Sequence, residues 1–321
     1  MIVDIFAHHV PQSVSEMIKK AGFFKQGDAQ INHHKGKSPA IYPLNNADPE
    51  TRLALMAKYG IDLQALSQTT PVLLYSSATE AAEICRLSND ANYALCKAYP
   101  HNFVNICIIS LLSIKSALKE MERALGELDC RAVTFSTNQN GRGIESQDYY
   151  PIYDILEKND LPLLLQPTDW ESYPLINGDQ GLGTMLAIGW PFDTTQAVLR
   201  LILGGVLDTF PSLKIVTHHC GAMIPFFAKR LEGTLFNRTK KPISEYWGNI
   251  YGDTAVNGSV PACMCGYAFF GSDRMMFGTD YPFGSPSTVS DTLASVKAMP
   301  IPAHDKKKIL GTNAQRLLKI A

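Results

Sequence analysis

Residues 213–219 have the sequence Leu213-Lys214-Ile215-Val216-Thr217-His218-His219, a short apolar run that ends in two imidazoles. A run of this length and composition, rich in Ile, Val and Leu, predicts a buried β-strand over 213–218. Helical patterns at 193–208 and 223–237 flank this strand. A strand between two helices is the repeating unit of α/β folds with a parallel sheet.

The same unit recurs along the chain. Short apolar runs predict seven further strands, at 2–7, 63–69, 104–109, 131–136, 162–166, 249–254 and 274–279. The remaining predicted helices are 48–59 (capped by Asp48, with Pro49 at its first position), 77–98, 112–127, 150–158, 287–298 and 304–319. Eight strands alternating with helices fit a closed barrel or a doubly wound sheet. No GxGxxG turn follows the first strand, which argues against the nucleotide-binding form of the open sheet. We therefore predict an α/β fold, a (β/α)8 TIM barrel, in which residues 1–321 form a single domain.

Composition narrows the functional classes. The chain has 321 residues, 45% of them hydrophobic, and a formal net charge of -1, with basic residues scattered rather than clustered. Nucleic acid is therefore not an expected partner. No apolar run is long enough to cross a membrane, and the N-terminus enters a strand at once without a leader pattern. We expect a cytoplasmic protein that acts on a small molecule, with its seven cysteines mostly free.

Two stretches have the composition of insertions. Residues 21–47 are rich in Gly, Pro, Asn and His, and 168–192 contain Trp170, Tyr173, Gly178 and Trp190. Long connections of this kind commonly cover active sites. We expect both to act as lids at the C-terminal face of the barrel.

Polar residues gather where the predicted strands end. Alternation puts Asp4, Phe6 and His8 on one face of the first strand. The fifth strand ends at Gln166, the sixth at His218-His219, and the eighth at Asp280. Barrel active sites lie at this end of the strands, so two imidazoles and a carboxylate are expected to converge. They would form a general base beside a carboxylate, or a metal site.

Each of these residues has an alternative structural explanation. A single histidine at a strand end is often a hydrogen-bonded core residue, and Asp280 alone would serve as a helix cap. Three such residues at one end of three strands favour a site. The other histidines are assigned structural or surface roles: His9, His33, His34, His101, His218 and His304. The aromatic residues expected near the mouth suit either stacking on a flat substrate or lid packing: Trp170, Tyr173, Trp190 and Tyr281.

Several motifs occur in an order that is specific when taken together. They are Asp48-Pro49-Glu50-Thr51-Arg52, Gly60-Ile61-Asp62-Leu63-Gln64-Ala65-Leu66-Ser67, Gly189-Trp190-Pro191-Phe192-Asp193-Thr194-Thr195, Phe210-Pro211-Ser212-Leu213-Lys214-Ile215, His219-Cys220-Gly221-Ala222-Met223-Ile224-Pro225 and Phe277-Gly278-Thr279-Asp280-Tyr281-Pro282-Phe283. From Met1 to about Leu318 the chain resembles the aminocarboxymuconate-semialdehyde decarboxylase branch of the amidohydrolase superfamily. The γ-resorcylate and 5-carboxyvanillate decarboxylases and the oxalomesaconate hydratases belong to this branch.

The resemblance implies a barrel that holds one divalent metal, often zinc or manganese. Its ligands would be a His-x-His or Glu-x-His on the first strand, a histidine on the fifth and an aspartate on the eighth. Carried over, His8 and Asp280 match two ligand positions, and His219 matches the catalytic histidine of the sixth strand. Phe6 and Gln166 occupy the other two ligand positions, where a phenyl ring cannot coordinate and a carboxamide is a poor zinc ligand. The substrate-holding arginine of the family has no clear match in 38–43.

Three hypotheses follow. The first is a decarboxylase (a lyase) or hydrolase of a small carboxylated or cyclic substrate that works without the family metal. In it His219 is the acid or base, Asp280 relays the proton, His8 and Gln166 orient the substrate, and Phe6 is an apolar wall. The second is a metal-dependent decarboxylase that holds zinc or manganese weakly on His8, His219 and Asp280. The third is a barrel that binds a ligand without catalysis. Because dimers occur in the family that the chain resembles, we also expect a homodimer.

Overall fold

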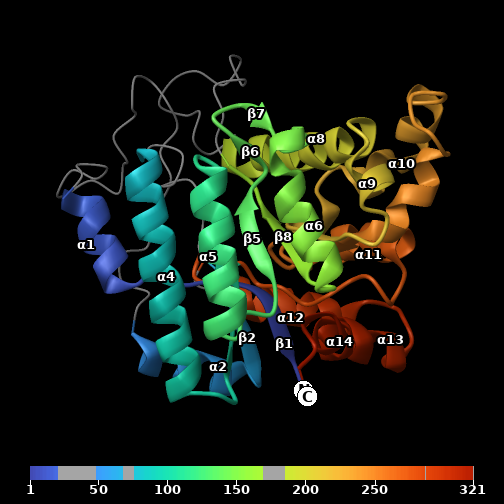
Figure 1. Ribbon diagram of the computed structural model, residues 1–321. Coiled ribbons are helices and arrows are strands. Elements are labelled where there is room, and N and C mark those ends of the chain that lie inside the picture. The colour runs from blue at the N-terminus through green and yellow to red at the C-terminus, as the bar shows by residue number, and fades with distance from the viewer. Residues whose placement is uncertain (21–47, 68–75, 169–184, 286, 321) are drawn as a thin grey trace.

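The strands form a closed ring with their carboxyl ends at one rim (Figure 1). The structure, a computed structural model, describes residues 1–20, 48–67, 76–168, 185–285 and 287–320. The strands of the ring are β1 (Val3–His8), β2 (Leu63–Ser67), β3 (Phe103–Asn105), β4 (Cys107–Ile108), β5 (Val133–Ser136), β8 (Pro162–Gln166), β9 (Lys214–Thr217) and β10 (Ile250–Gly252). A small antiparallel pair, β6 (Asn138–Gln139) and β7 (Arg142–Gly143), lies outside the ring.

The hydrogen-bonded order of the strands closes the barrel. The order β1-β2-β3 is parallel, and so is β4-β5-β8-β9-β10. With only Ile106 between them, β3 and β4 are the two halves of one strand, so these segments make up seven strands of the ring. Residues 274–281 complete the ring, because Met275 bridges Gly252 of β10 and Tyr281 bridges Ala7 of β1, both in parallel. The predicted TIM barrel is confirmed, although the eighth strand is a chain of single bridges rather than a regular ladder.

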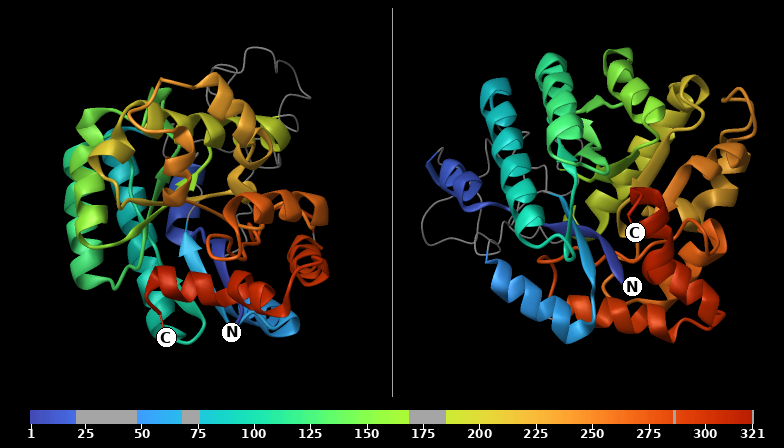
Figure 2. Two further views of the ribbon diagram at one scale, coloured as in Figure 1. Left: turned by 90° about the vertical axis from the view of Figure 1, so that its right-hand side faces the viewer. Right: turned by 60° about the horizontal axis from the view of Figure 1, so that its bottom comes forward.

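Helices surround the ring (Figures 1 and 2). They are α1 (Gln12–Lys20), α2 (Pro49–Tyr59), α4 (Ala78–Ala98), α5 (Ile114–Glu127), α6 (Tyr150–Lys158), α8 (Trp190–Leu203), α9 (Val206–Thr209), α10 (Ile224–Thr234), α11 (Val260–Phe270), α12 (Thr288–Ala298), α13 (Ala303–Lys307) and α14 (Asn313–Leu318). The predicted cap of α2 is confirmed, since the Asp48 carboxylate accepts the backbone N–H groups of Glu50 and Thr51. None of the described helices is long and apolar enough to cross a membrane.

Helices α1 and α11 were not predicted from the sequence. Helix α11 is apolar on nearly all sides and so lacks the one-sided periodicity that marks a surface helix. It contains Cys263 and Cys265, and both thiols are free. Its buried side includes Phe270, which fills the space above Gly252 and Gly221.

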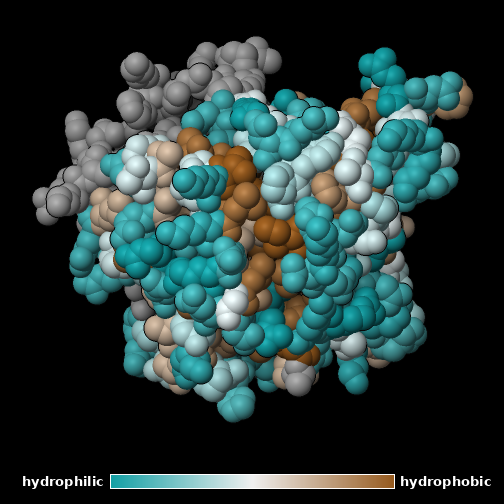
Figure 3. Space-filling view, viewed as in Figure 1, coloured by the Kyte–Doolittle hydropathy of each residue, from teal (hydrophilic) through white to brown (hydrophobic). Residues whose placement is uncertain are grey.

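Alternation along the strands creates two apolar layers. Val216 belongs to a buried cluster with Val3, Ile5 and Leu164, which fills the inside of the barrel. Neighbouring residues such as Ile215 belong to the larger cluster between the strands and the helices. The outward helix faces are largely polar, with an apolar band visible between α5 and α6 (Figure 3). The two termini lie close together at the end of the barrel opposite the carboxyl rim (Figure 2).

The expected lids fall mainly outside the described residues. This applies to all of 21–47 and to 169–184, and therefore to Trp170 and Tyr173. The described part of the second insertion is a π-helical turn, Met185–Gly189, that leads into α8. Asp193 in the first turn of α8 accepts hydrogen bonds from Thr137, Asn138 and the backbone of Thr168. These bonds fix α8 to the ends of β5 and β8.

Candidate functional site

Three polar side chains meet at the carboxyl rim of the barrel. His8 ends β1, His218 follows β9, and Asp280 follows the eighth strand segment. Asp280 Oδ1 lies 3.0 Å from His8 Nε2 and 3.1 Å from His218 Nε2. Both imidazoles have no exposed surface, whereas the Asp280 side chain is 20% exposed. Among the described residues, this is a set whose donor atoms could hold a metal ion.

The second imidazole of the cluster belongs to His218 and not to the predicted His219. We assigned His218 a structural role and placed His219 in the cluster, but His218 is the residue that lies within it. His219 is close as well, with its Nε2 3.9 Å from Asp280 Oδ2 and its side chain 17% exposed. The missed signal is the alternation from Val216, which faces the barrel interior and so directs His218 the same way.

Both inner imidazoles are held through their Nδ1 atoms. His218 Nδ1 is hydrogen-bonded to Asp253, a buried residue directly after β10, and His8 Nδ1 lies 3.1 Å from Ser67 Oγ. The Nε2 atoms of both rings thereby face Asp280. His218 Nε2 has no hydrogen-bond partner among the described residues. The sequence analysis missed Asp253 because the predicted strand 249–254 included it, whereas the observed strand β10 ends at Gly252 and leaves the aspartate at the strand end, as with Asp280.

The backbone after β9 is strained. His219, Cys220, Gly221 and Ala222 all have positive φ, between 54° and 77°. A run of non-glycine residues in this region is costly and is often found at functional sites. Asp253 stabilises the turn, because its Oδ1 accepts the Cys220 backbone N–H at 2.8 Å. The same aspartate therefore fixes the ring of His218 and the turn that presents His219.

Asp280 is held in a comparable way. Its φ is 63°, and its backbone N–H donates to the Phe6 carbonyl at 3.0 Å. Burial raises the pKa of Asp280, but the neighbouring charge of His218 and the contacts with His219 and His8 lower it well below its usual range. The carboxylate is therefore ionised.

The three histidines have different pKa directions. Burial lowers the pKa of His218, but the carboxylates of Asp253 and Asp280 outweigh burial and raise it to about 10. Burial also lowers the pKa of His8, and Asp280 opposes that effect. Burial and the nearby charge of His218 lower the pKa of His219. With protein groups alone, the positive charge of the cluster thus resides on His218.

The remaining predicted site residues surround this cluster at different places. The Phe6 ring stacks on His218, with centroids 4.3 Å apart and planes 22° apart. The Trp190 ring is nearly parallel to His219, with centroids 6.4 Å apart and planes 21° apart. Gln166 is buried at the end of β8, and its Oε1 has no hydrogen-bond partner among the described residues. The guanidinium carbon of Arg52 lies over the Tyr281 ring, 4.7 Å from the ring centroid.

A second polar network lies below the rim on the outer side of β1 and β2, facing α2, and we call it the deeper network. Arg52, which is buried, donates from Nη1 to Gln64 at 2.9 Å and from Nη2 to the His8 carbonyl at 2.6 Å. Gln64 donates in turn to Asp4, which also accepts the backbone N–H and hydroxyl of Thr279. Burial raises the pKa of Asp4 to about 7, against the effects of Thr279, Gln64 and Arg52. The prediction that Asp4 shares the inner face with Phe6 and His8 is wrong, because the register shift between Asp4 and Ala7 turns Asp4 to the side of Gln64. Neither Asp4 nor Arg52 had been assigned a role.

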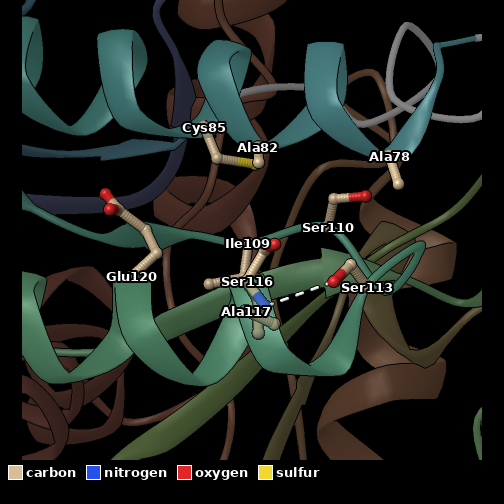
Figure 4. A pocket seen from close by; sticks show the side chains of 9 residues that line it. All are labelled: Ala78, Ala82, Cys85, Ile109, Ser110, Ser113, Ser116, Ala117 and Glu120. Atoms are coloured by element: carbon tan, nitrogen blue, oxygen red, sulfur yellow. Dashed lines mark hydrogen bonds between the residues drawn. The ribbon is translucent and has the colours of Figure 1, made fainter.

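A small cavity lies outside the ring of strands, between α4 and α5 (Figure 4). Its volume is about 10 Å³, which is room for about one water molecule. Cys85 faces it from α4 and Glu120 from α5 (Figure 4). Burial raises the pKa of the Cys85 thiol, so this sulfur is an inert part of the helix interface.

Comparison with known proteins gives a consistent result. The family model described as Amidohydrolase matches residues 5–320. The 2-amino-3-carboxymuconate-6-semialdehyde decarboxylase of Dictyostelium discoideum is 26% identical, over 98% of this chain and 91% of its own. The gamma-resorcylate decarboxylase of Rhizobium sp. strain MTP-10005 is 29% identical, over 84% of this chain and 87% of its own. Among solved structures, the 5-carboxyvanillate decarboxylase of Sphingomonas paucimobilis superposes with a TM-score of 0.86 at 23% identity, covering 100% of this chain and 99% of its own.

Proposed function

Because the chain belongs to the amidohydrolase family, we propose that it is a decarboxylase, a lyase that removes CO2 from a small aromatic carboxylate. The observation that carries the proposal is the placement of His219 and Asp280 at the rim of the barrel, beside the ring of Trp190. The relatives described above are decarboxylases by name, and this supports the reaction class.

Decarboxylation of an aromatic acid requires a proton donor at the reacting carbon. The bond between the ring and the carboxylate breaks, CO2 leaves, and the electron pair that stays on the ring carbon forms a new C–H bond. We assign delivery of this proton to His219, with Asp280 as the relay 3.9 Å away. His219 suits this role better than its neighbours, since His8 and His218 have no exposed surface and His219 is 17% exposed.

The surroundings of His219 favour a flat substrate. Trp190 presents its ring almost parallel to the imidazole, and aromatic faces bind planar rings well. We assign Trp190 and Tyr281 to substrate binding on this ground, and we propose that Trp170 contributes as well. His8 and Gln166 remain candidates for orienting the carboxylate, Gln166 because its buried amide oxygen has no hydrogen-bond partner among the described residues.

The metal positions that the family resemblance implies do not fit this chain. Phe6 has no donor atom, and its ring is occupied in stacking on His218. Gln166 offers only a carboxamide where the family has an imidazole. We derive no reaction step through a metal held at those two positions.

The test is a search for turnover with labelled substrates. We would incubate the protein with hydroxybenzoates, including 2,6-dihydroxybenzoate and 5-carboxyvanillate, labelled with ¹³C in the carboxyl group. Release of ¹³CO2, with deuterium from D2O at the vacated ring carbon, is the expected result. The His219→Asn variant should lose about 10²–10⁴-fold in kcat while keeping its fold by circular dichroism. Full activity in this variant would remove His219 from the mechanism, and hydrolysis without CO2 would favour the hydrolase alternative.

We further propose that the chain forms a homodimer in the cytoplasm. Phe226 and Phe236, on and just after α10, are 77% and 73% exposed, and large exposed aromatic residues are frequent at protein interfaces. Sedimentation equilibrium of the wild-type protein and of a Phe226→Ser, Phe236→Ser variant tests this assembly. A monomeric wild-type protein would contradict it.

A further inference from the structure

We propose that this barrel binds a divalent transition metal, Zn²⁺ or Mn²⁺, through Nε2 of His8, Nε2 of His218 and Oδ1 of Asp280. This set differs from the ligands that the family resemblance implies, because it contains His218 and leaves out positions 6 and 166. It also differs from the set predicted from the sequence, which contained His219. The proposal concerns binding, and it stands or falls independently of decarboxylation.

The spacing of the three atoms fits a metal. Asp280 Oδ1 lies 3.0 Å from one imidazole nitrogen and 3.1 Å from the other, and all three atoms lie within 4.8 Å of one another. Ligands held tetrahedrally at about 2.1 Å from zinc are about 3.4 Å from each other. Only a small outward movement of side chains would admit the ion. Two imidazoles and one carboxylate form a ligand type found in metalloenzymes and leave positions for a substrate.

His218 Nε2 is an unsatisfied atom aimed into this set. The side chain is fully buried, and the nitrogen has no hydrogen-bond partner among the described residues although Asp280 is near. Asp253 accepts from Nδ1, so a neutral His218 carries a lone pair on Nε2. A lone pair facing a carboxylate oxygen is unfavourable unless a cation lies between them. Without a metal, a proton on Nε2 supplies the positive charge between the two atoms, which are 3.1 Å apart, and a divalent ion would replace that proton.

The supporting contacts are those typical of metal sites. Metal-bound imidazoles usually donate their other nitrogen to a carboxylate or another oxygen acceptor, which fixes the ring. Here Asp253 holds His218, and Ser67 lies 3.1 Å from His8 Nδ1. The Ser67 hydroxyl can accept from Nδ1, which leaves the His8 Nε2 lone pair for a metal.

Phe6, at the position where a ligand is missing, packs directly against His218, the ligand that we propose in its place. Phe6 occupies a position at which the resemblance implies a ligand, and its ring packs flat on His218, 4.3 Å between centroids. The phenyl ring therefore supports one face of the imidazole that we propose as the replacement. We infer that the metal site has exchanged ligands rather than been lost.

Metal binding can be measured without turnover. We would strip the purified protein with chelator, dialyse it, and titrate it with Zn²⁺ or Mn²⁺ by isothermal calorimetry, with metal content checked by mass spectrometry. Wild-type protein should bind one equivalent per chain. His218→Asn should weaken binding by more than about 100-fold, and Asp253→Asn by about 10–100-fold, the usual cost of losing a supporting partner.

Two neighbouring histidines provide matched controls. His219→Asn should change the affinity less than about 3-fold because the residue is not a ligand in this proposal. His9→Asn removes another buried imidazole, one bonded to Asn92, and should leave binding unchanged. A rise in melting temperature on adding Zn²⁺, present in both controls and lost in His218→Asn, separates ligand loss from unfolding. Wild-type protein that binds neither metal would overturn the proposal, as would a His219→Asn variant that loses binding while His218→Asn keeps it.

Discussion

Two polar clusters lie one above the other along the same two strands, and they differ in how well their atoms are satisfied. In the deeper one, Asp4 accepts three hydrogen bonds, two from Thr279 and one from Gln64, and Arg52 makes two through its Nη atoms while its Nε has no partner among the described residues. At the rim, His218 Nε2 and His219 Nδ1 have no hydrogen-bond partner among the described residues. Strand β1 supplies a residue to each cluster, Asp4 below and His8 above.

The difference separates support from function. Buried polar groups that stabilise a fold are usually paired, because an unpaired group costs about 1–3 kcal/mol. Unpaired atoms at the rim are therefore expected where a ligand completes the set. The deeper network also clamps the rim, since Arg52 donates to the His8 carbonyl and lies over Tyr281, next to Asp280. We expect changes in the deeper network to affect mainly stability, and changes at the rim to affect mainly binding and turnover.

The largest effect on stability should come from Arg52→Met. This change removes a buried cation that joins Gln64, His8 and Tyr281, and leaves their polar atoms unpaired. Breaking a buried charged network by removing one member costs about 3–5 kcal/mol of unfolding free energy. Urea denaturation measures this cost. The matched control is Arg142→Met, an exposed pair with Asp148, which should cost less than about 1 kcal/mol. Equal losses in both variants would show that the deeper network is not a special support.

A second effect should appear in the pH dependence of stability. Burial raises the pKa of Asp4 to about 7, whereas an unfolded aspartate has a pKa of 3.8. Between these two values the folded protein binds more protons than the unfolded chain, so the contribution of Asp4 to stability falls as pH rises. From pH 5 to pH 7 we expect a loss of about 2 kcal/mol from this group. Arg52, Gln64 and Thr279 are the charged and polar groups that face it.

The measurement is a difference between two proteins. Urea unfolding at pH 5, 6 and 7 would compare wild-type protein with Asp4→Asn, which lacks this titration. His9 acts in the opposite direction, because burial and Arg52 lower its pKa to about 4 and its contribution grows as pH rises. The effect of His9 is common to both proteins and cancels in the difference. Parallel pH profiles for wild-type protein and Asp4→Asn would argue against the raised pKa.

The sequence predicted the ring of strands because apolar runs and strand ends repeat along it. It did not predict α11, because a helix that is apolar on nearly all sides has no polar stripe to reveal its period. It placed His8 and Asp280 at one rim correctly, since the carboxyl ends of parallel strands meet. The sequence prediction named His219 instead of His218 because the family motif aligns His219 with a catalytic histidine. The alternation of side chains along the strand from Val216 indicates His218. The positive φ of His219, which brings this second imidazole near Asp280, is a tertiary feature that no local pattern shows.

The smallest effect, a difference of about 1 kcal/mol between two glycine variants, sharpens the comparison at the rim. Gly221 and Gly271 both have positive φ, 77° and 67°, so alanine is strained at either position. A Cβ on Gly221 would lie 2.6 Å from the Phe270 ring, whereas one on Gly271 would meet nothing within 4 Å. Gly271→Ala should therefore cost about 1–3 kcal/mol, because a φ of 67° with a ψ of 179° is a conformation essentially restricted to glycine. Gly221→Ala should cost about 1 kcal/mol more because of the clash.

Function should separate these two variants more than stability does. Gly221 belongs to the turn that presents His219, so Gly221→Ala should also lower kcat and shift metal affinity, while Gly271→Ala should leave both unchanged. Urea unfolding, turnover and Zn²⁺ titration on the same preparations give the comparison. The contrary outcome is that both variants lose stability equally and keep wild-type turnover and metal affinity. Displacing the backbone next to His219 would then have no consequence for the groups that meet at Asp280. The strained turn after β9 would in that case be a feature of the fold alone.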